Sequence, residues 1–222
     1  MEVMLIILMI ALGIFFILVS QYLIEKNGII NIYLIYNIAS FLLSFKIMEV
    51  MKININANIV LSSLFTSLTY LIIDKTNIKE YKKVIKQTLT INIIISIVLL
   101  ISTLYIGTIN DINSVNMQNI FLKNYKILIG FPIITLINQI LILLVYNEIK
   151  ETIENTNTKI ILTNLTILMV ETILFSISSY IFNIKLPHLL VLIISNYLIK
   201  VIITSIYTPF ISHLINQKKV KV

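Results

Sequence analysis

The sequence predicts an all-α polytopic membrane protein, a bundle of about seven transmembrane helices in one membrane domain, residues 1–222. Two observations lead to this prediction. Of the 222 residues, 58% are hydrophobic and only 12% are charged, whereas a soluble domain carries about 25% charged residues. The charged residues also gather in short joints between long apolar stretches, so too few remain to cover a water-facing surface.

Seven stretches are apolar over the roughly 20 residues that a spanning helix needs. We expect helices because the bilayer core holds no water to satisfy an exposed backbone. The stretches are residues 3–24, 29–48, 53–73, 89–109, 127–146, 160–182 and 189–211.

Polar joints separate these stretches in order along the chain. The first stretch is too long for the apolar core of a signal peptide and lacks a lysine-rich start, so we interpret it as a retained helix. The joints that define the later helices are the lysine-rich loop 74–88, the asparagine-rich loop 110–126, the polar loop 147–159 and the short joint 183–188.

The lysines predict the orientation of the bundle. All 17 basic residues are lysines, and an arrangement with the N-terminus outside places eleven of them inside and five outside. Positive charge is enriched in cytoplasmic loops. We therefore expect an N-out/C-in, multi-pass protein of the cell membrane, in contact with lipid on its outer faces.

Two charged residues lie in the middle of predicted spans. Glu171 is eleven residues from each end of stretch 160–182, and Lys200 is eleven residues from each end of stretch 189–211. A short joint makes these helices antiparallel neighbours, so both side chains reach the same depth and are candidates for an ion pair. An unpaired charge there costs at least ~2.5–3.5 kcal/mol. The pair is either part of a functional site or a structural pair that orients the two helices.

Polar side chains on several helices occupy similar depths. Asn138 and Gln139 lie in the middle of stretch 127–146, and the other polar residues recur at helical spacing along one face of each helix. These stripes are Asn164, Glu171 and Ser178; Asn196, Lys200, Thr204 and Thr208; and Ser62, Thr66 and Tyr70. Hydroxyl stripes alone are typical of close helix packing, whereas stripes that combine amides and charges favour a polar binding site.

Several classes of protein lack support in the sequence. There is no cysteine for a thiolate metal site or nucleophile, and no phosphate-binding loop or zinc protease motif. His188 and His213 lie at helix ends. We expect no enzyme activity, no cofactor and no metal site. We expect no nucleic-acid partner, because the lysines lie in loops between apolar segments.

Local strings from about residue 40 to residue 212 keep a consistent order and spacing. They are Lys46-Ile47-Met48-Glu49-Val50, Thr69 with Asp74-Lys75 and Lys79-Glu80-Tyr81-Lys82-Lys83, Asn138-Gln139, Val170-Glu171-Thr172-Ile173, Tyr197-Leu198-Ile199-Lys200-Val201 and Thr208-Pro209-Phe210. This set resembles the queuosine precursor transporter (vitamin uptake transporter) family. The resemblance implies a six-helix transporter core, residues 29–212, with residues 3–24 as an extra N-terminal helix.

The family imports purine-like 7-deazaguanines such as preQ0, preQ1 or queuine. The resemblance therefore implies a substrate site of Glu171, Lys200, Asn138, Gln139, Tyr70, Thr66, Asn196 and Tyr207. The chain departs from the family pattern because Tyr70, Tyr207, Leu168 and Phe41 stand where polar residues are expected.

The leading hypothesis is a carrier that imports a small planar heterocycle by alternating access around the mid-membrane site. In this hypothesis the Glu171 carboxylate accepts hydrogen bonds from the ring, Lys200 and the amides donate to it, and Tyr70 and Tyr207 stack on it. Glu171 is also the candidate carrier of a coupled proton. The alternatives are a substrate-binding subunit that uses a separate ATPase module, a membrane-embedded enzyme, and a structural membrane protein. A homo-oligomer is compatible with each.

Overall fold

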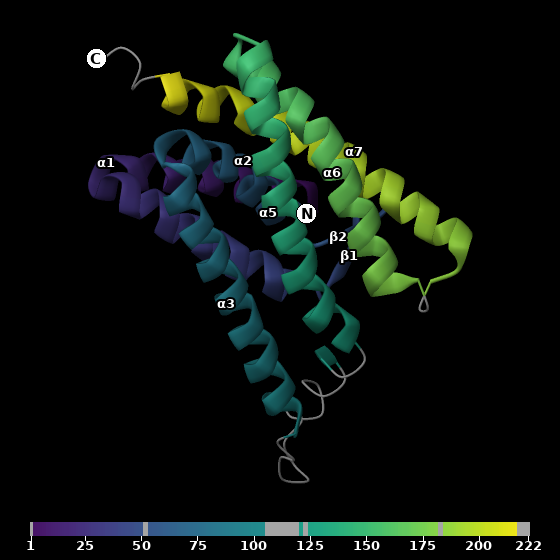
Figure 1. Cartoon of the computed structure of the whole chain (residues 1–222). Coiled ribbons are helices and arrows are strands. Elements are labelled where there is room, and N and C mark those ends of the chain that lie inside the picture. Colours follow the sequence, from purple (N-terminus) through teal and green to yellow (C-terminus); the bar gives the residue numbers. More distant parts are fainter. Residues whose placement is uncertain (1, 51–52, 105–119, 122–123, 182–183, 217–222) are drawn as a thin grey trace.

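The computed structural model describes residues 2–50, 53–104, 120–121, 124–181 and 184–216 (Figure 1). Its elements are α1 (Glu2–Leu43), β1 (Ile47–Val50), β2 (Ile53–Asn56), α2 (Ile59–Lys75), α3 (Ile78–Leu104), α5 (Tyr125–Thr152), α6 (Thr156–Tyr180) and α7 (Leu186–Asn216). Four of these helices, α3, α5, α6 and α7, are long and apolar enough to cross a membrane. The predicted helical membrane fold is therefore supported, while the number of spans and the orientation stay predictions.

The outer faces of the long helices are apolar. Large aliphatic side chains such as Ile94 on α3, Ile129 on α5 and Val191 on α7 are more than half exposed. In water such a surface would be unfavourable, whereas lipid tails are as apolar as these side chains. The exposed faces are thus suited to contact with lipid.

Helix α1 folds back on itself. The Tyr36 hydroxyl donates a hydrogen bond to the Gly13 carbonyl oxygen at 3.3 Å, across 23 residues of sequence. A straight helix would separate these residues by about 34 Å, at 1.5 Å per residue. The axis therefore reverses between them, and Figure 1 shows two purple segments of α1 on the same side of the molecule. Sequence analysis predicted two helices here, 3–24 and 29–48, and the reversal gives α1 two arms.

Helix α2 lies at the centre of the bundle. It packs against α1, α7, α5 and α3, and fourteen of its residues are buried. Its hydroxyl side chains, from Ser62 to Thr69, donate hydrogen bonds to carbonyl oxygens of the same helix. Small side chains that satisfy themselves in this way allow neighbouring helices to approach closely.

A β-hairpin replaces part of two predicted helices. Strands β1 and β2 pair antiparallel, with Ile47 opposite Asn56 and Val50 opposite Ile53. The predictions of helix up to residue 48 and from residue 53 were wrong at these ends, because α1 ends at Leu43 and α2 begins at Ile59. The cause is the period-two alternation of Ile and Asn from residue 53 to residue 56, which is typical of a strand and which average hydropathy does not detect.

Asn56 attaches the hairpin to three helices. Its backbone N–H donates to Asn196 Oδ1 on α7 at 2.9 Å, and its side-chain amide donates to the Tyr180 hydroxyl on α6 at 2.7 Å and to the Ser44 carbonyl just after α1 at 3.4 Å. Its side-chain oxygen accepts from the Asn58 N–H at 3.1 Å. These bonds fix the chain where it enters α2.

Two predicted loops are largely helical. In the segment 74–88, α2 continues to Lys75 and α3 begins at Ile78, and in the segment 147–159 the helices leave only residues 153–155 between them. Charged residues did not end the helices because helix ends that extend beyond the lipid tolerate charge. Most of the predicted loop 110–126 falls outside the described residues.

Gly13 allows the first arm of α1 to approach the core closely. A Cβ atom at this position would lie 3.2 Å from both Leu64 Cδ2 on α2 and the Tyr207 hydroxyl on α7. We predict that Gly13→Leu lowers stability by about 1–3 kcal/mol, the usual cost of overpacking, measured by thermal unfolding in detergent. Ala11→Leu, which adds bulk at an exposed position of the same helix, is the control. Equal unfolding temperatures for the two variants would contradict this packing.

Candidate binding site

Glu171 and Lys200 form the ion pair that their spacing predicted. Lys200 Nζ on α7 lies 2.7 Å from Glu171 Oε1 on α6, and the side chains are only 7% and 12% exposed. Helices α6 and α7 are antiparallel neighbours joined by a short connection, which places their midpoints at one depth. The geometry gives each charge its partner inside the bundle, as a mid-membrane charge requires.

Asn138 completes the surroundings of the carboxylate. Its Nδ2 atom on α5 donates to Glu171 Oε2 at 3.2 Å, so each carboxylate oxygen has a donor. The other end of this amide, Oδ1, is buried and accepts no hydrogen bond from the described residues. A buried polar atom without a partner is costly, and it marks a place where a ligand or water donor fits.

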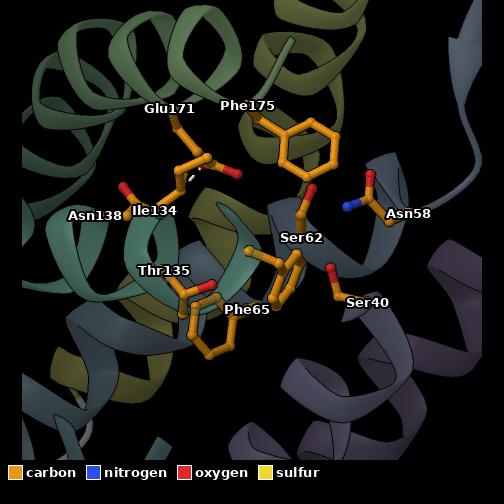
Figure 2. Close-up of a pocket in the computed structure, with 10 residues that line it drawn as sticks. Ser40, Asn58, Ser62, Phe65, Ile134, Thr135, Asn138, Glu171 and Phe175 are labelled. Atoms are coloured by element: carbon orange, nitrogen blue, oxygen red, sulfur yellow. Dashed lines mark hydrogen bonds between the residues drawn. The ribbon is translucent and has the colours of Figure 1, made fainter. Parts of the chain in front are cut away.

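A cavity lies beside this pair, between α1, α2, α5 and α6. Its free volume is about 20 Å³, which is room for about one water molecule, so the surrounding helices or side chains must move apart before a larger ligand enters. Figure 2 shows Asn58, Ser62 and Ser40 on one side of the space and Glu171 with Phe175 on another. The lining residues are Ser40, Asn58, Ser62, Phe65, Phe131, Ile134, Thr135, Asn138, Glu171 and Phe175.

Helical spacing explains how distant parts of the chain line one cavity. Phe131, Thr135 and Asn138 are separated by four and three residues, which places them on one face of α5. Asn58, Ser62 and Phe65 have the same spacing at the start of α2, and Phe175 lies one turn after Glu171 on α6. Each helix thus contributes one turn-spaced row of polar and aromatic side chains.

The polar groups of the lining have unused hydrogen-bonding capacity. The Ser40 hydroxyl is buried without a partner. Asn58 and Thr135 are also buried polar residues of the lining. Together with Asn138 Oδ1 they offer donors and acceptors to a ligand.

Aromatic rings form the apolar part of the lining. The rings of Phe131 and Phe175 meet edge to face, with centroids 6.4 Å apart. Phe41, which stands where the resemblance implies an asparagine, stacks on the outer side of Phe131 at 4.5 Å. The rings are therefore held in fixed orientations, and they present apolar surface to a flat molecule.

The structure brings together three of the predicted site residues, Glu171, Lys200 and Asn138, and places the other five elsewhere. Gln139 points to a different face of α5, where it donates to the hydroxyls of Tyr33 and Thr88. Tyr70 donates to Asn164 Oδ1 at 2.5 Å.

Thr66, Asn196 and Tyr207 also lie outside the cavity lining. Thr66 donates to the Ser62 carbonyl of its own helix, and Asn196 accepts the hydrogen bond from the hairpin. Tyr207 lines a separate apolar pocket between α1 and α7, with its hydroxyl unpartnered among the described residues.

Most residues of the cavity lining were not predicted from the sequence. Thr135 and Phe131 could have been found, because they share the helical face of Asn138. Asn58 and Ser40 could not, because the first follows a hairpin that was predicted as helix and the second is one serine among many apolar residues. The described residues contain no group of three or more His, Cys, Asp or Glu side chains placed to hold a metal ion.

Comparison with known families identifies the chain. Residues 28–214 match the family model described as vitamin uptake-like sensor. The chain belongs to this family. The match contains the whole cavity and both members of the ion pair, and it supports the resemblance to vitamin and queuosine-precursor uptake proteins. No curated protein and no solved structure matches the chain.

Membership in the vitamin uptake-like sensor family fits the long apolar helices, so the chain is a membrane protein of the transporter and sensor type. The family description refers to uptake and sensing and not to catalysis.

Proposed function

We propose that the protein binds a small planar heterocycle in the cavity beside Glu171 and carries it across the cell membrane by alternating access. The observation that carries the proposal is a small space with aromatic walls and two buried polar atoms without partners among the described residues, next to a buried ion pair. Transporter sites lie near the bilayer midplane, between helices that move against each other. Queuosine precursors of the 7-deazaguanine type are the candidate substrates.

The chemistry of the cavity supports this class of ligand. A flat ring placed between Phe131, Phe175 and Phe65 covers apolar surface, while the edge of the ring meets amides and hydroxyls. The Asn58 amide offers both a donor and an acceptor, and Asn138 Oδ1 offers an acceptor. Heterocycles with alternating N–H and C=O groups match such an edge. Glu171 also remains the candidate for proton coupling, because it borders the cavity.

We predict that cells without their own importer gain uptake of labelled 7-cyano-7-deazaguanine when they produce this protein. Glu171→Gln and Lys200→Met should each lower the initial rate by at least about tenfold, since loss of one partner disturbs the carboxylate that borders the ligand. Met169→Leu and Leu198→Met, at exposed positions of α6 and α7, are matched controls that should retain uptake. Uptake that is unaffected by both charge variants would reject the site.

A second candidate function is ligand sensing without transport, and the description of the family as a sensor favours it. The two functions differ in one measurement on purified protein in liposomes. A carrier accumulates or exchanges labelled ligand inside the vesicles, and exchange rises when unlabelled ligand is present on the other side. A sensor binds the ligand with the same dependence on Glu171 and leaves the vesicle interior unlabelled.

A further inference from the structure

The charges around the cavity wall bear on the net charge of the ligand that the cavity accepts. Of the described residues that line the cavity, Glu171 alone is charged. Its counter-ion, Lys200, is bonded to Oε1 at 2.7 Å but does not line the cavity, so it lies behind the carboxylate as seen from the ligand. The wall therefore presents carboxylate oxygens whose charge is already balanced from inside the protein.

The net charge of the Glu171–Lys200 pair is zero whichever of the two side chains holds the shared proton. A carboxylate with an ammonium and a carboxylic acid with an amine both have a net charge of zero. Both Glu171 oxygens also already have donors, Lys200 and Asn138. A charged ligand would thus enter a buried site that offers no uncompensated charge of opposite sign, and burying an uncompensated charge is unfavourable.

On this basis we propose that the cavity selects electrically neutral planar heterocycles, and that Lys200 is the residue that sets this selectivity. The inference rests on the proposed function, because it concerns the ligand of the same site. Among the queuosine precursors named above the cavity selects the neutral nitrile preQ0 over preQ1 and queuine, whose aliphatic amines are cationic at neutral pH. Asn58, Thr135, Ser40 and Asn138 Oδ1 recognise such a ligand by hydrogen bonds that need no charge. Lys200 acts through Glu171 as a positioning and charge-balancing residue without touching the ligand.

The test uses one ring in three charge states: neutral nicotinamide, anionic nicotinate and cationic 1-methylnicotinamide. Affinities for the purified full chain are measured by ligand-detected NMR and by the shift of the unfolding temperature. The wild-type protein should bind nicotinamide at least about tenfold more tightly than either ion.

Charge variants should change this ranking in opposite directions. Lys200→Met leaves one negative charge, so 1-methylnicotinamide should become the tightest ligand. Glu171→Gln leaves one positive charge, so nicotinate should become the tightest. The double variant restores neutrality and should again favour nicotinamide, which keeps the test decisive if one single variant does not fold.

Lys159→Met is the matched control, because Lys159 is a buried lysine on α6 that does not line the cavity. It changes the net charge of the protein by the same amount as Lys200→Met, and it should leave the affinity ranking of the three probes unchanged. Equal binding of all three probes to the wild type, or an unchanged ranking in the charge variants, would overturn charge selection while leaving the proposed site intact. No binding of any probe to the wild type or to the double variant would also overturn charge selection, whereas the proposed function is tested separately by uptake of 7-cyano-7-deazaguanine.

Discussion

Removing one partner of the Glu171–Lys200 pair should destabilise the protein more than removing both. Lys200→Met leaves a buried carboxylate with only the Asn138 amide, and Glu171→Gln leaves a buried ammonium without an acidic partner. Breaking a buried ion pair in this way costs about 3–5 kcal/mol, whereas replacing both charges is often close to neutral. We expect each single variant to unfold at a clearly lower temperature and the double variant to recover most of the loss.

Thermal unfolding in detergent, read by an intrinsic tyrosine signal, measures the three variants against the wild type. Because the residues are in contact, the effects should be strongly non-additive. Met169→Leu, two residues before Glu171 on the exposed face of α6, controls for general sensitivity of the helix. If the double variant loses the sum of the single losses, the two charges do not stabilise each other.

Filling the cavity should abolish ligand binding. Thr135 is a buried residue of the cavity lining on α5. Thr135→Phe would place a ring in the space that we assign to the ligand. We expect affinity for 7-cyano-7-deazaguanine and nicotinamide to fall by roughly 100-fold or more, while overpacking lowers the free energy of unfolding by about 1–3 kcal/mol.

Ile133→Phe is the matched control for this experiment. Ile133 lies two residues away on α5 with a side chain that is 52% exposed, so the added ring enters lipid. Its ligand binding should equal that of the wild type. Wild-type affinity in Thr135→Phe would show that the ligand binds elsewhere, and a large loss of stability would show that the cavity cannot accept a ring.

The fold could be predicted from the sequence where one physical requirement dominates. Long apolar runs predicted the approximate sequence positions of α3, α5, α6 and α7, because a chain in lipid has few alternatives to a helix. The hairpin and the start of α3 at Ile78 were missed. Both lie at the ends of the most apolar stretches. There the local pattern of residues and tertiary hydrogen bonds such as those of Asn56 determine the structure.

The site was predictable only in its charged part. A charge at mid-membrane needs a partner at the same depth, and this requirement linked Glu171 to Lys200 across 29 residues. For neutral residues no such requirement exists. Gln139 and Asn138 are adjacent in sequence, yet they point to different faces of α5, and the cavity could be assigned to Asn138 only after the helix orientation was known.

The central helix α2 has a consequence for the way the protein is made. In the finished bundle it is enclosed by neighbours, one of which, α7, is synthesised last among the described helices. Its hydroxyls already donate to carbonyl oxygens of their own helix, so they place no unmet donor in lipid before those neighbours arrive. The polar groups of this segment are therefore satisfied within the helix before α7 is made, and the arrival of α7 closes the bundle around it.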